Sequence, residues 1–215
     1  MERMTTEVLI TGRTHMQGNI RCIGGLDLIH PRSYRFLNPD GSNYDIVRDP
    51  EFRIAPFEVG KVFRIEYAPA PKITTPHTED VLVYHAKDLR DEADVRGVIE
   101  RLGVRLYSGV GVRGLFDGKL VFKGNKAYVS PENPSDHSTC FWVSNVPIKP
   151  FKEIDKQTNK ERYRMLCDGL NLPYVGEGEI RELAPGTLVR FSLSREFKPG
   201  DGSPGGCFLQ LSGWF

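Results

Sequence analysis

The chain contains one pattern twice, as Val59-Gly60-Lys61-Val62-Phe63-Arg64-Ile65-Glu66-Tyr67 and as Pro185-Gly186-Thr187-Leu188-Val189-Arg190-Phe191-Ser192-Leu193. In each copy a glycine turn precedes a run in which every second residue is large and apolar, with an arginine on the opposite face. A period of two with this polarity indicates a β-strand that has one side in a core. Two related β units predict a tandem of small barrels rather than one large fold.

Composition supports a mainly β protein. The chain has 215 residues, of which 22 are Gly and 15 are Pro, placed between short apolar runs. Gly and Pro at this spacing favour many short strands joined by tight turns. The length suits two domains of about 100 residues each.

Charge and cysteine content limit the classes of partner and compartment. The formal net charge is only +1, so a basic site has to be a local patch. The four cysteines form no CxxC pair, and no N-terminal segment resembles a signal peptide. No apolar run approaches the ~18 residues of a membrane span. We therefore expect a reduced, cytoplasmic protein without membrane contact.

The first part of the chain is typical of a five-stranded barrel. Residues 7–14 predict a strand that Gly12 bends, and strands at 20–28 and 33–37 follow it. A long link, 44–56, then precedes the strand 61–67. A long connection between strands three and four is typical of the oligonucleotide/oligosaccharide-binding barrel, the OB-fold. Residues 81–84 are the expected closing strand.

The remainder predicts a connector and a second barrel. Asp88 begins the expected helix and Gly103 ends it, while Asp117-Gly118 indicates a hairpin between two apolar runs. The charged run 149–160 is expected to be a loop or short helix. The predicted strands of the second barrel are 139–145, 161–167, 187–193 and 206–214. The expected domains are a first OB-like barrel at 1–86, a helix and hairpin connector at 87–125 and a second OB-like barrel at 126–215.

The strand 160–167 carries the clearest candidate binding surface. Alternation places Arg162 and Arg164 on one face, and Tyr163, Met165 and Cys167 on the other. A basic stripe on the second strand of a barrel suits a phosphate backbone. The alternative is a solvent-exposed strand whose cations only prevent pairing with other strands at the edge of the sheet.

Other cations and rings extend this hypothesis to both halves of the chain. Bases stack on exposed rings beside arginines, although most rings of a small barrel belong to its core. The loop 15–18 follows the first strand, and loops at this position line the cleft of an OB-fold. The predicted nucleic-acid-binding residues are Arg13, His15, Arg21, Arg35, Arg162, Arg164, Arg190 and Trp142.

The segment Pro76-His77-Thr78-Glu79-Asp80 has the densest group of catalytic side-chain types. In an extended segment only His77 and Glu79 share a face, where they suit a metal or acid–base role. The alternative is structural, with His77, Glu79 and Asp80 capping backbone amides. A zinc site from His137, Cys140, Cys167 and Cys207 lacks paired ligand spacing. No nucleotide-binding or hydrolase motif is present, so neither catalytic residues nor cofactors are expected.

With these residues in view, the sequence resembles the prokaryotic dual OB-containing domain family. The likeness spans nearly the whole chain. It is carried by the segments 9–14, 22–27, 33–37, 56–62, His77-Thr78-Glu79-Asp80 and Gln210-Leu211-Ser212-Gly213-Trp214. The resemblance implies two OB-folds and an association with conflict or antiviral loci. It also implies binding to nucleic acid or to a companion effector.

The sequence thus predicts a non-enzymatic module that binds nucleic acid, with single-stranded DNA or RNA as the expected partner. Two alternatives stay open. One is a protein adaptor or inhibitor of a companion effector, which suits the near-zero net charge. The other is a metal-dependent enzyme that uses His77 and Glu79.

Overall fold

The computed structural model describes residues 2–49, 56–154, 161–198 and 205–215. The chain divides into two compact units, Met1–Val104 and Arg105–Phe215. The residues 87–125, expected to form a connector, are shared between these units. In the described residues, no helix is long and apolar enough to cross a membrane.

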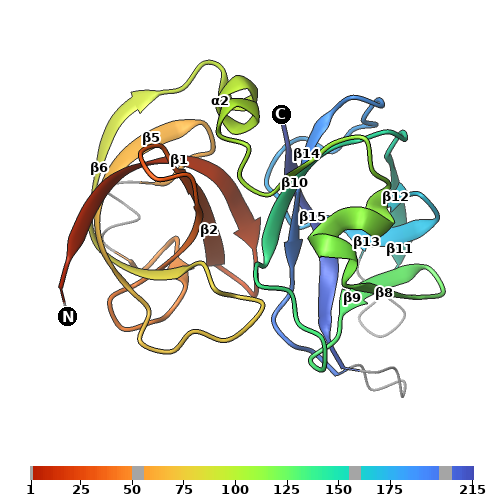
Figure 1. Cartoon of the computed structure of the whole chain (residues 1–215), viewed down its shortest axis with the longest axis horizontal. Helices are drawn as coiled ribbons and strands as arrows, with labels where there is room; N and C mark the ends of the chain where they lie inside the picture. The colour runs from red at the N-terminus through yellow and green to blue at the C-terminus, as the bar shows by residue number, and fades with distance from the viewer. Residues whose placement is uncertain (1, 50–55, 155–160, 199–204) are drawn as a thin grey trace. The chain divides into compact units, whose positions relative to one another are not determined.

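The first unit is a closed barrel, which appears as a ring of strands on the left of Figure 1. Its elements are β1 (Met4–His15), β2 (Ile20–Asp27), β3 (Ser33–Leu37), β4 (Tyr44–Asp45), β5 (Lys61–Pro69), β6 (Asp80–Asp91) and α2 (Val95–Leu102). β1 pairs antiparallel with both β2 and β5, β2 with β3, and β5 with β6. The circuit closes through the parallel pair β3 and β6. This circuit of five strands is that of an OB-fold.

Apolar alternation fills the interior of this barrel, as expected. Phe63 and Ile65 of β5 are fully buried, whereas Arg64 between them is exposed. The predicted bend of the first strand is confirmed, since the register of β1 against β2 shifts between Ile10 and Gly12. Gly25 of β2 lets the two strands approach, because a Cβ there would lie 2.3 Å from Val8 Cγ1.

The helix is shorter than predicted. β6 continues to Asp91, so Asp88 belongs to a strand that pairs with Phe63 and does not begin the helix. The N-cap is Asp94, whose Oδ1 accepts a hydrogen bond from the Gly97 amide at 2.8 Å. The helix ends at Gly103, as expected. The difference arises because β6 continues to pair with β5 as far as Asp91, and so takes up the first residues of the stretch predicted to be helical.

The second unit has more strands. Its elements are β7 (Leu106–Tyr107), η1 (Val112–Gly118), β8 (Leu120–Lys123), β9 (Lys126–Val129), β10 (Thr139–Val143), β11 (Lys149–Ile154), β12 (Glu161–Cys167), β13 (Leu170–Pro173), β14 (Leu188–Leu193) and β15 (Cys207–Trp214). Lys149–Ile154 is a strand rather than the expected loop or helix, because it pairs along its length with β12. The rest of that charged run, 155–160, lies outside the described residues.

The predicted hairpin at Asp117-Gly118 is wrong. Residues 112–118 form the 3-10 element η1, and Phe116 and Asp117 both have positive φ values of 51° and 57°. Leu115 and Phe116 are fully buried, which favours a compact turn over a projecting ribbon. A hairpin does form further along the chain, where β8 and β9 pair and Gly124 and Asn125 make the turn.

The second unit repeats the circuit of the first, with its opening strand in two pieces. β10 pairs with β14, and β11 pairs with β12. β12 pairs with β13, and β14 pairs with β15. A parallel bridge between Tyr174 and Leu211 joins the end of the third strand to the last one. The chain is therefore mainly β, with two OB-like barrels in tandem, as predicted.

The sequence pattern that occurs twice occupies the same place in both barrels. Gly60 and Gly186 have φ values of +93° and +88°, a backbone region that suits glycine. The Gly60 amide donates to Ile10 O at 3.0 Å, and the Gly186 amide donates to Ser144 O at 2.7 Å. The strand after each glycine thus meets the first strand of its barrel in the same register, which confirms the repeat.

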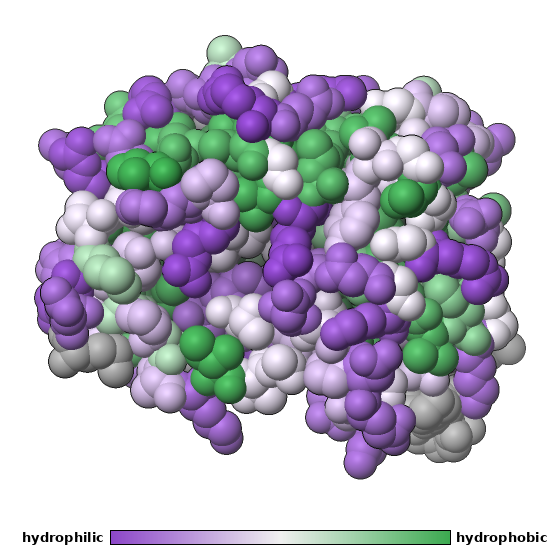
Figure 2. Space-filling model, in the orientation of Figure 1, coloured by the Kyte–Doolittle hydropathy of each residue, from purple (hydrophilic) through white to green (hydrophobic). Residues whose placement is uncertain are grey.

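Apolar side chains are also exposed on both units. Ile29, Ile154 and Phe197 are 59%, 60% and 58% exposed. On the face of the molecule drawn in Figure 2, hydrophobic residues lie in small groups among hydrophilic ones.

Candidate nucleic-acid interface

The outer face of β11, β12 and β13 in the second barrel carries the predicted basic stripe. Met165 and Cys167 are fully buried in the core, whereas Arg162 is exposed and Arg164 is partly exposed. The alternation predicted for this strand is confirmed at these positions. Phe151 of β11 stands opposite Arg164 in the register and is 36% exposed, so a ring and a guanidinium lie side by side on this face.

This face continues into a cleft of about 460 Å³, which we call the β12–β13 cleft. The strands that line it are β11, β12, β13 and β15, together with the segment after β14 and the β8–β9 hairpin. In an OB-fold the face of strands two and three is the usual ligand surface. The lining residues are Asn125, Lys126, Ala127, Glu153, Arg164, Asn171, Leu172, Pro173, Ser194, Phe197, Phe208, Leu209 and Gln210.

Two aromatic rings form part of the cleft wall. Phe208 alternates with the buried Cys207 and Leu209 on β15, so its side chain lies on the outer face. Phe197 packs against it with ring centroids 6.4 Å apart and an interplanar angle of 66°. Tyr128 also packs against Phe208, with ring centroids 5.4 Å apart. Because Phe197 is 58% exposed, its ring offers a flat surface to a ligand.

Among the described residues that line the cleft, two are cations and one is an acid. Arg164 Nε donates to Glu153 Oε2 at 2.8 Å, and the two side chains are 22% and 40% exposed. This hydrogen bond uses one edge of the guanidinium. Lys126 is exposed at the hairpin tip. The neutral amides Asn125, Asn171 and Gln210 supply further hydrogen-bonding groups.

Two residues predicted for this interface lie in the interior instead. Trp142 is 0% exposed, and its Nε1 donates to Val110 O at 2.9 Å. Arg190 is 5% exposed and donates to Ser212 Oγ at 2.9 Å. The expectation that Trp142 stacks on a base is therefore corrected, because its side chain packs in the hydrophobic core of the second barrel.

The predicted residues of the first barrel do not form a comparable surface. Arg21 is 7% exposed, and its guanidinium donates to the backbone oxygens of Gly18 and Ile20. Arg13 donates to Pro56 O at 3.3 Å and is only partly exposed. His15 is exposed at the end of β1, beside the loop that joins β1 to β2. Arg21 thus supports its own loop.

Arg35 belongs to a buried ionic network. Its Nε and NH2 donate to the two carboxylate oxygens of Asp80, each at 2.5 Å, and its NH1 lies 3.1 Å from His77 Nδ1. Since a guanidinium only donates, Nδ1 is the acceptor and the His77 proton lies on Nε2. Burial is the largest single influence and lowers the pKa of Arg35, but the hydrogen bonds to Asp80 together with the electrostatic effects of Cys22, Asp80 and Glu79 outweigh it, so this pKa lies above its usual value. The expected phosphate contact from Arg35 is corrected accordingly.

The segment from Pro76 to Asp80 takes part in this network and is not extended as predicted. The notion of an extended segment with His77 and Glu79 on one face is wrong, because residues 74–78 turn back through hydrogen bonds from the amides of His77 and Thr78. The turn brings His77 and Asp80 together on Arg35, and all three are at most 7% exposed. A guanidinium at 3.1 Å from His77 Nδ1 opposes a cation there.

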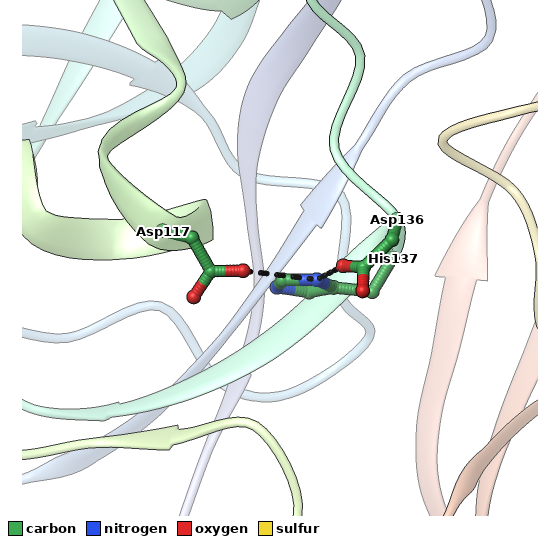
Figure 3. A group of neighbouring side chains, drawn as sticks. All are labelled: Asp117, Asp136 and His137. Carbon is green, nitrogen blue, oxygen red and sulfur yellow. Dashed lines mark hydrogen bonds and ion pairs between the residues drawn. The ribbon is translucent and has the colours of Figure 1, made fainter.

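Within the described residues, one group of three side chains has atoms close enough for a metal ion: Asp117, Asp136 and His137 (Figure 3). His137 Nδ1 lies 2.7 Å from Asp136 Oδ1 and 4.0 Å from Asp117 Oδ2. Arg105 already donates to Asp136 Oδ2 at 2.9 Å and lies 3.9 Å from Asp117. The hydrogen bond to His137, and next to it Arg105, lowers the pKa of Asp136. The group is thus an ionic network that joins η1 to the segment before β10.

The zinc arrangement considered from the sequence does not form. Cys140, Cys167 and Cys207 belong to the hydrophobic core of the second barrel, and His137 lies among aspartates instead. All four cysteines are free thiols.

Of the residues that line the cleft, only Arg164 was among the predicted binding residues. Phe197 and Asn171 have no distinctive local pattern. The β8–β9 hairpin does have one, since Gly124-Asn125 between apolar runs is a two-residue turn signal. That dipeptide predicts a hairpin with Lys126 directly after its turn.

No protein-family profile matches the chain, and the search of curated proteins gave no match. Solved structures do resemble it. A murine DNA-binding protein bound to double-stranded DNA matches with 13% identity and a TM-score of 0.33, over 100% of this chain and 97% of that one. A replication protein A heterotrimer bound to single-stranded DNA matches with 10% identity and a TM-score of 0.39, over 99% and 49%. The p204 HINb domain matches with 12% identity and a TM-score of 0.36, over 97% of each chain. The fold assignment itself rests on the strand pairing described above.

Proposed function

We propose that this protein binds single-stranded nucleic acid in the β12–β13 cleft of its second barrel. The observation that carries the proposal is that Arg164 lines the cleft together with Phe197 and Phe208, and stands opposite Phe151 in the strand register. A surface for single strands combines cations that follow the phosphates with rings on which bases stack. Both parts are present here.

Phosphates would lie along Arg162, Arg164 and Lys126, and bases would stack on the exposed faces of Phe197 and Phe208. Each stacked base contributes about 1 to 3 kcal/mol by alanine substitution. With a net charge of only +1, attraction has to come from these local cations. Binding is therefore expected to weaken as salt rises, with a shallow slope set by two or three phosphate contacts.

Single strands suit the cleft better than a duplex. The flat rings and neutral amides of its wall are groups that interact with base faces and base edges. In a duplex the base faces are stacked and their pairing edges are occupied. The first barrel is less suited, because Arg21 and Arg35 are buried on its corresponding strands.

We also propose a biological setting for this binding. The resemblance of the sequence to a family of conflict-associated proteins favours an accessory role in a prokaryotic defence system, in the cytoplasm, beside a companion effector. A stoichiometric protein partner in the absence of any nucleic-acid binding would favour the adaptor alternative.

The test is fluorescence anisotropy with labelled oligo-dT and oligo-rU of about 12 nucleotides at about 50 mM salt. We expect binding that Phe208→Ala weakens about tenfold and that Arg164→Ala also weakens. The matched control is Arg64→Ala, since Arg64 is an exposed arginine of the first barrel that pairs with Glu7. Absence of binding by the wild-type protein, or an equal loss in the control, would overturn the proposal.

A further inference from the structure

We propose that Glu153 makes the β12–β13 cleft selective for guanine, by accepting hydrogen bonds from the pairing edge of that base. This inference rests on the function proposed above and adds to it a preference among bases. Three observations support it: Glu153 is the one acid among the described residues that line the cleft, its carboxylate is accessible, and neighbouring contacts hold it in place.

The charge of Glu153 opposes the binding of a phosphate chain. Because like charges repel, a carboxylate in this cleft weakens binding of every nucleic acid to a similar extent. The repulsion is offset where the carboxylate accepts hydrogen bonds from N–H groups of the ligand. A group that repels most ligands and attracts one of them provides specificity. Glu153 is therefore expected to discriminate between bases.

The carboxylate of Glu153 is open to a ligand. Its side chain is 40% exposed, on the wall of a cleft of about 460 Å³, a volume typical of pockets that take a small molecule. Within the part of the chain that the structure describes, its hydrogen-bond partner is Arg164, whose Nε donates to Oε2 at 2.8 Å. Oε1 is left for a ligand, and Oε2 keeps a second lone pair, since an ionised carboxyl group has about four acceptor sites.

Two contacts fix the position of this carboxylate. β11 pairs along its length with β12, and in that register Glu153 stands opposite Arg162. The hydrogen bond from Arg164 then orients the carboxylate itself. A group that discriminates between ligands needs such a fixed origin. The two arginines also leave this end of the cleft with a positive balance, so attraction of phosphates persists beside the acid.

Guanine is the base that suits a group which only accepts hydrogen bonds. Its pairing edge presents two neighbouring donors, N1–H and the 2-amino group, and one carboxylate can accept from both. Adenine and cytosine have a ring nitrogen acceptor beside their amino group, and thymine has one N–H between two carbonyl oxygens. Each of these three bases would turn a lone pair toward the carboxylate. In a single strand the pairing edge is free to be read in this way.

The experiment compares oligonucleotides of about 12 nucleotides in which every third base is guanine, adenine or hypoxanthine and the remainder are thymine. Adenine controls for the stronger stacking of a purine, and hypoxanthine is guanine without its 2-amino group. We expect the guanine oligonucleotide to bind about fivefold or more tightly than the other two, measured by fluorescence anisotropy at about 50 mM salt.

The variant Glu153→Gln separates base selection from charge. Its amide replaces one acceptor by a donor, so the ratio of the dissociation constants for the adenine and guanine oligonucleotides should fall close to one. Loss of a negative charge alone would strengthen binding to all three oligonucleotides and leave this ratio unchanged. Glu182→Gln is the matched control, because Glu182 pairs with Lys149 and does not line the cleft. This control should keep the wild-type ratio.

The outcomes distinguish this inference from the proposed function. Equal binding of the three oligonucleotides by the wild type, or an unchanged preference in Glu153→Gln, overturns the role of Glu153 and leaves the cleft intact. A preference that Glu182→Gln also loses overturns it as well, since the effect would then come from overall charge. Failure of the wild type to bind any of the three overturns the proposed function, and this inference with it.

Discussion

Arg64 and Arg190 occupy equivalent positions in the two barrels but have opposite environments. Arg64 lies in β5 and Arg190 in β14, each four residues after the turn glycine. Arg64 stands opposite Glu7 and is 54% exposed at its side chain, with NH2 3.0 Å from Glu7 Oε1. Arg190 stands opposite Phe141 and is 5% exposed. The repeated pattern therefore predicts which face of the strand the arginine lies on, but not whether other residues cover that face.

The predicted binding residues divide in the same way into exposed and buried arginines. Arg162 and Arg164 remain on an outer surface, whereas Arg21, Arg35 and Arg190 are buried with polar partners. An arginine buried with partners mainly stabilises the fold, since moving its charge to a ligand would break those hydrogen bonds.

Glu153→Gln is expected to strengthen nucleic-acid binding. The Glu153 carboxylate lies in the cleft, where it repels phosphates and holds Arg164 Nε at 2.8 Å. The amide removes the negative charge and keeps the shape. We expect a severalfold lower dissociation constant for oligo-dT, measured by anisotropy at low salt.

Glu182→Gln is the control for net charge. Glu182 pairs with Lys149 at 3.5 Å on the surface and does not line the cleft. Equal gains in both variants would show a nonspecific charge effect. Weaker binding by Glu153→Gln would contradict the assignment of the cleft.

Asp80→Ala is expected to destabilise the first barrel strongly. The substitution leaves the Arg35 guanidinium, which is 7% exposed, without its two carboxylate hydrogen bonds. Breaking a buried pair in this way costs about 3 to 5 kcal/mol. The free energy of unfolding, measured by urea denaturation with circular dichroism, gives the check.

Asp88→Ala is the matched comparison, since Asp88 lies on the same strand and pairs with Lys61 at 3.1 Å on the surface. We expect little change there. A similar loss in both variants would mean that the Arg35 network has no special role in stability. Retained stability in Asp80→Ala would reopen a functional role for the His77 segment.

The sequence predicts the barrels well because their signals are local and repeated. The bend at Gly12, the strand 61–67 and the buried side of β12 all follow from period-two alternation and glycine placement. OB-like topology followed from the long link between the third and fourth strands. These features depend on neighbours along the chain.

The cleft is less predictable because it is assembled from distant segments. Asn125, Arg164 and Phe208 come from three parts of the sequence that meet only in the folded barrel. The turn at residues 74–78 directs Asp80 rather than Glu79 to Arg35, which alternation in an extended segment does not predict. Burial of Trp142 likewise depends on the whole core.

Cysteine reactivity should follow burial. Cys140, Cys167 and Cys207 are 0%, 0% and 6% exposed, whereas Cys22 is partly exposed. In the folded protein we expect a maleimide to label Cys22 first and the other three only after unfolding. Mass spectrometry of labelled peptides with and without denaturant makes the comparison. Rapid labelling of Cys167 in the native state would contradict the buried core of the second barrel.

Stability should fall at alkaline pH. Burial, aided by the charge of Asp168, raises the pKa of the Cys167 thiol from 9.0 to about 12. The unfolded chain loses this proton near its ordinary pKa while the folded chain keeps it. The stabilisation is therefore complete below pH 9.0 and is lost as the pH rises toward about 12. Urea denaturation between about pH 8 and pH 11 should show this decline.

The variant Cys167→Ala separates this thiol from other alkaline effects. It removes the titrating group, so its stability should depend less steeply on pH above 9.0 than that of the wild type. Burial also raises the pKa of Tyr174 to about 12, so Tyr174→Phe should flatten the curve in the same direction at somewhat higher pH. If Cys167→Ala and the wild type lose stability with the same slope, the thiol does not ionise on unfolding in this range.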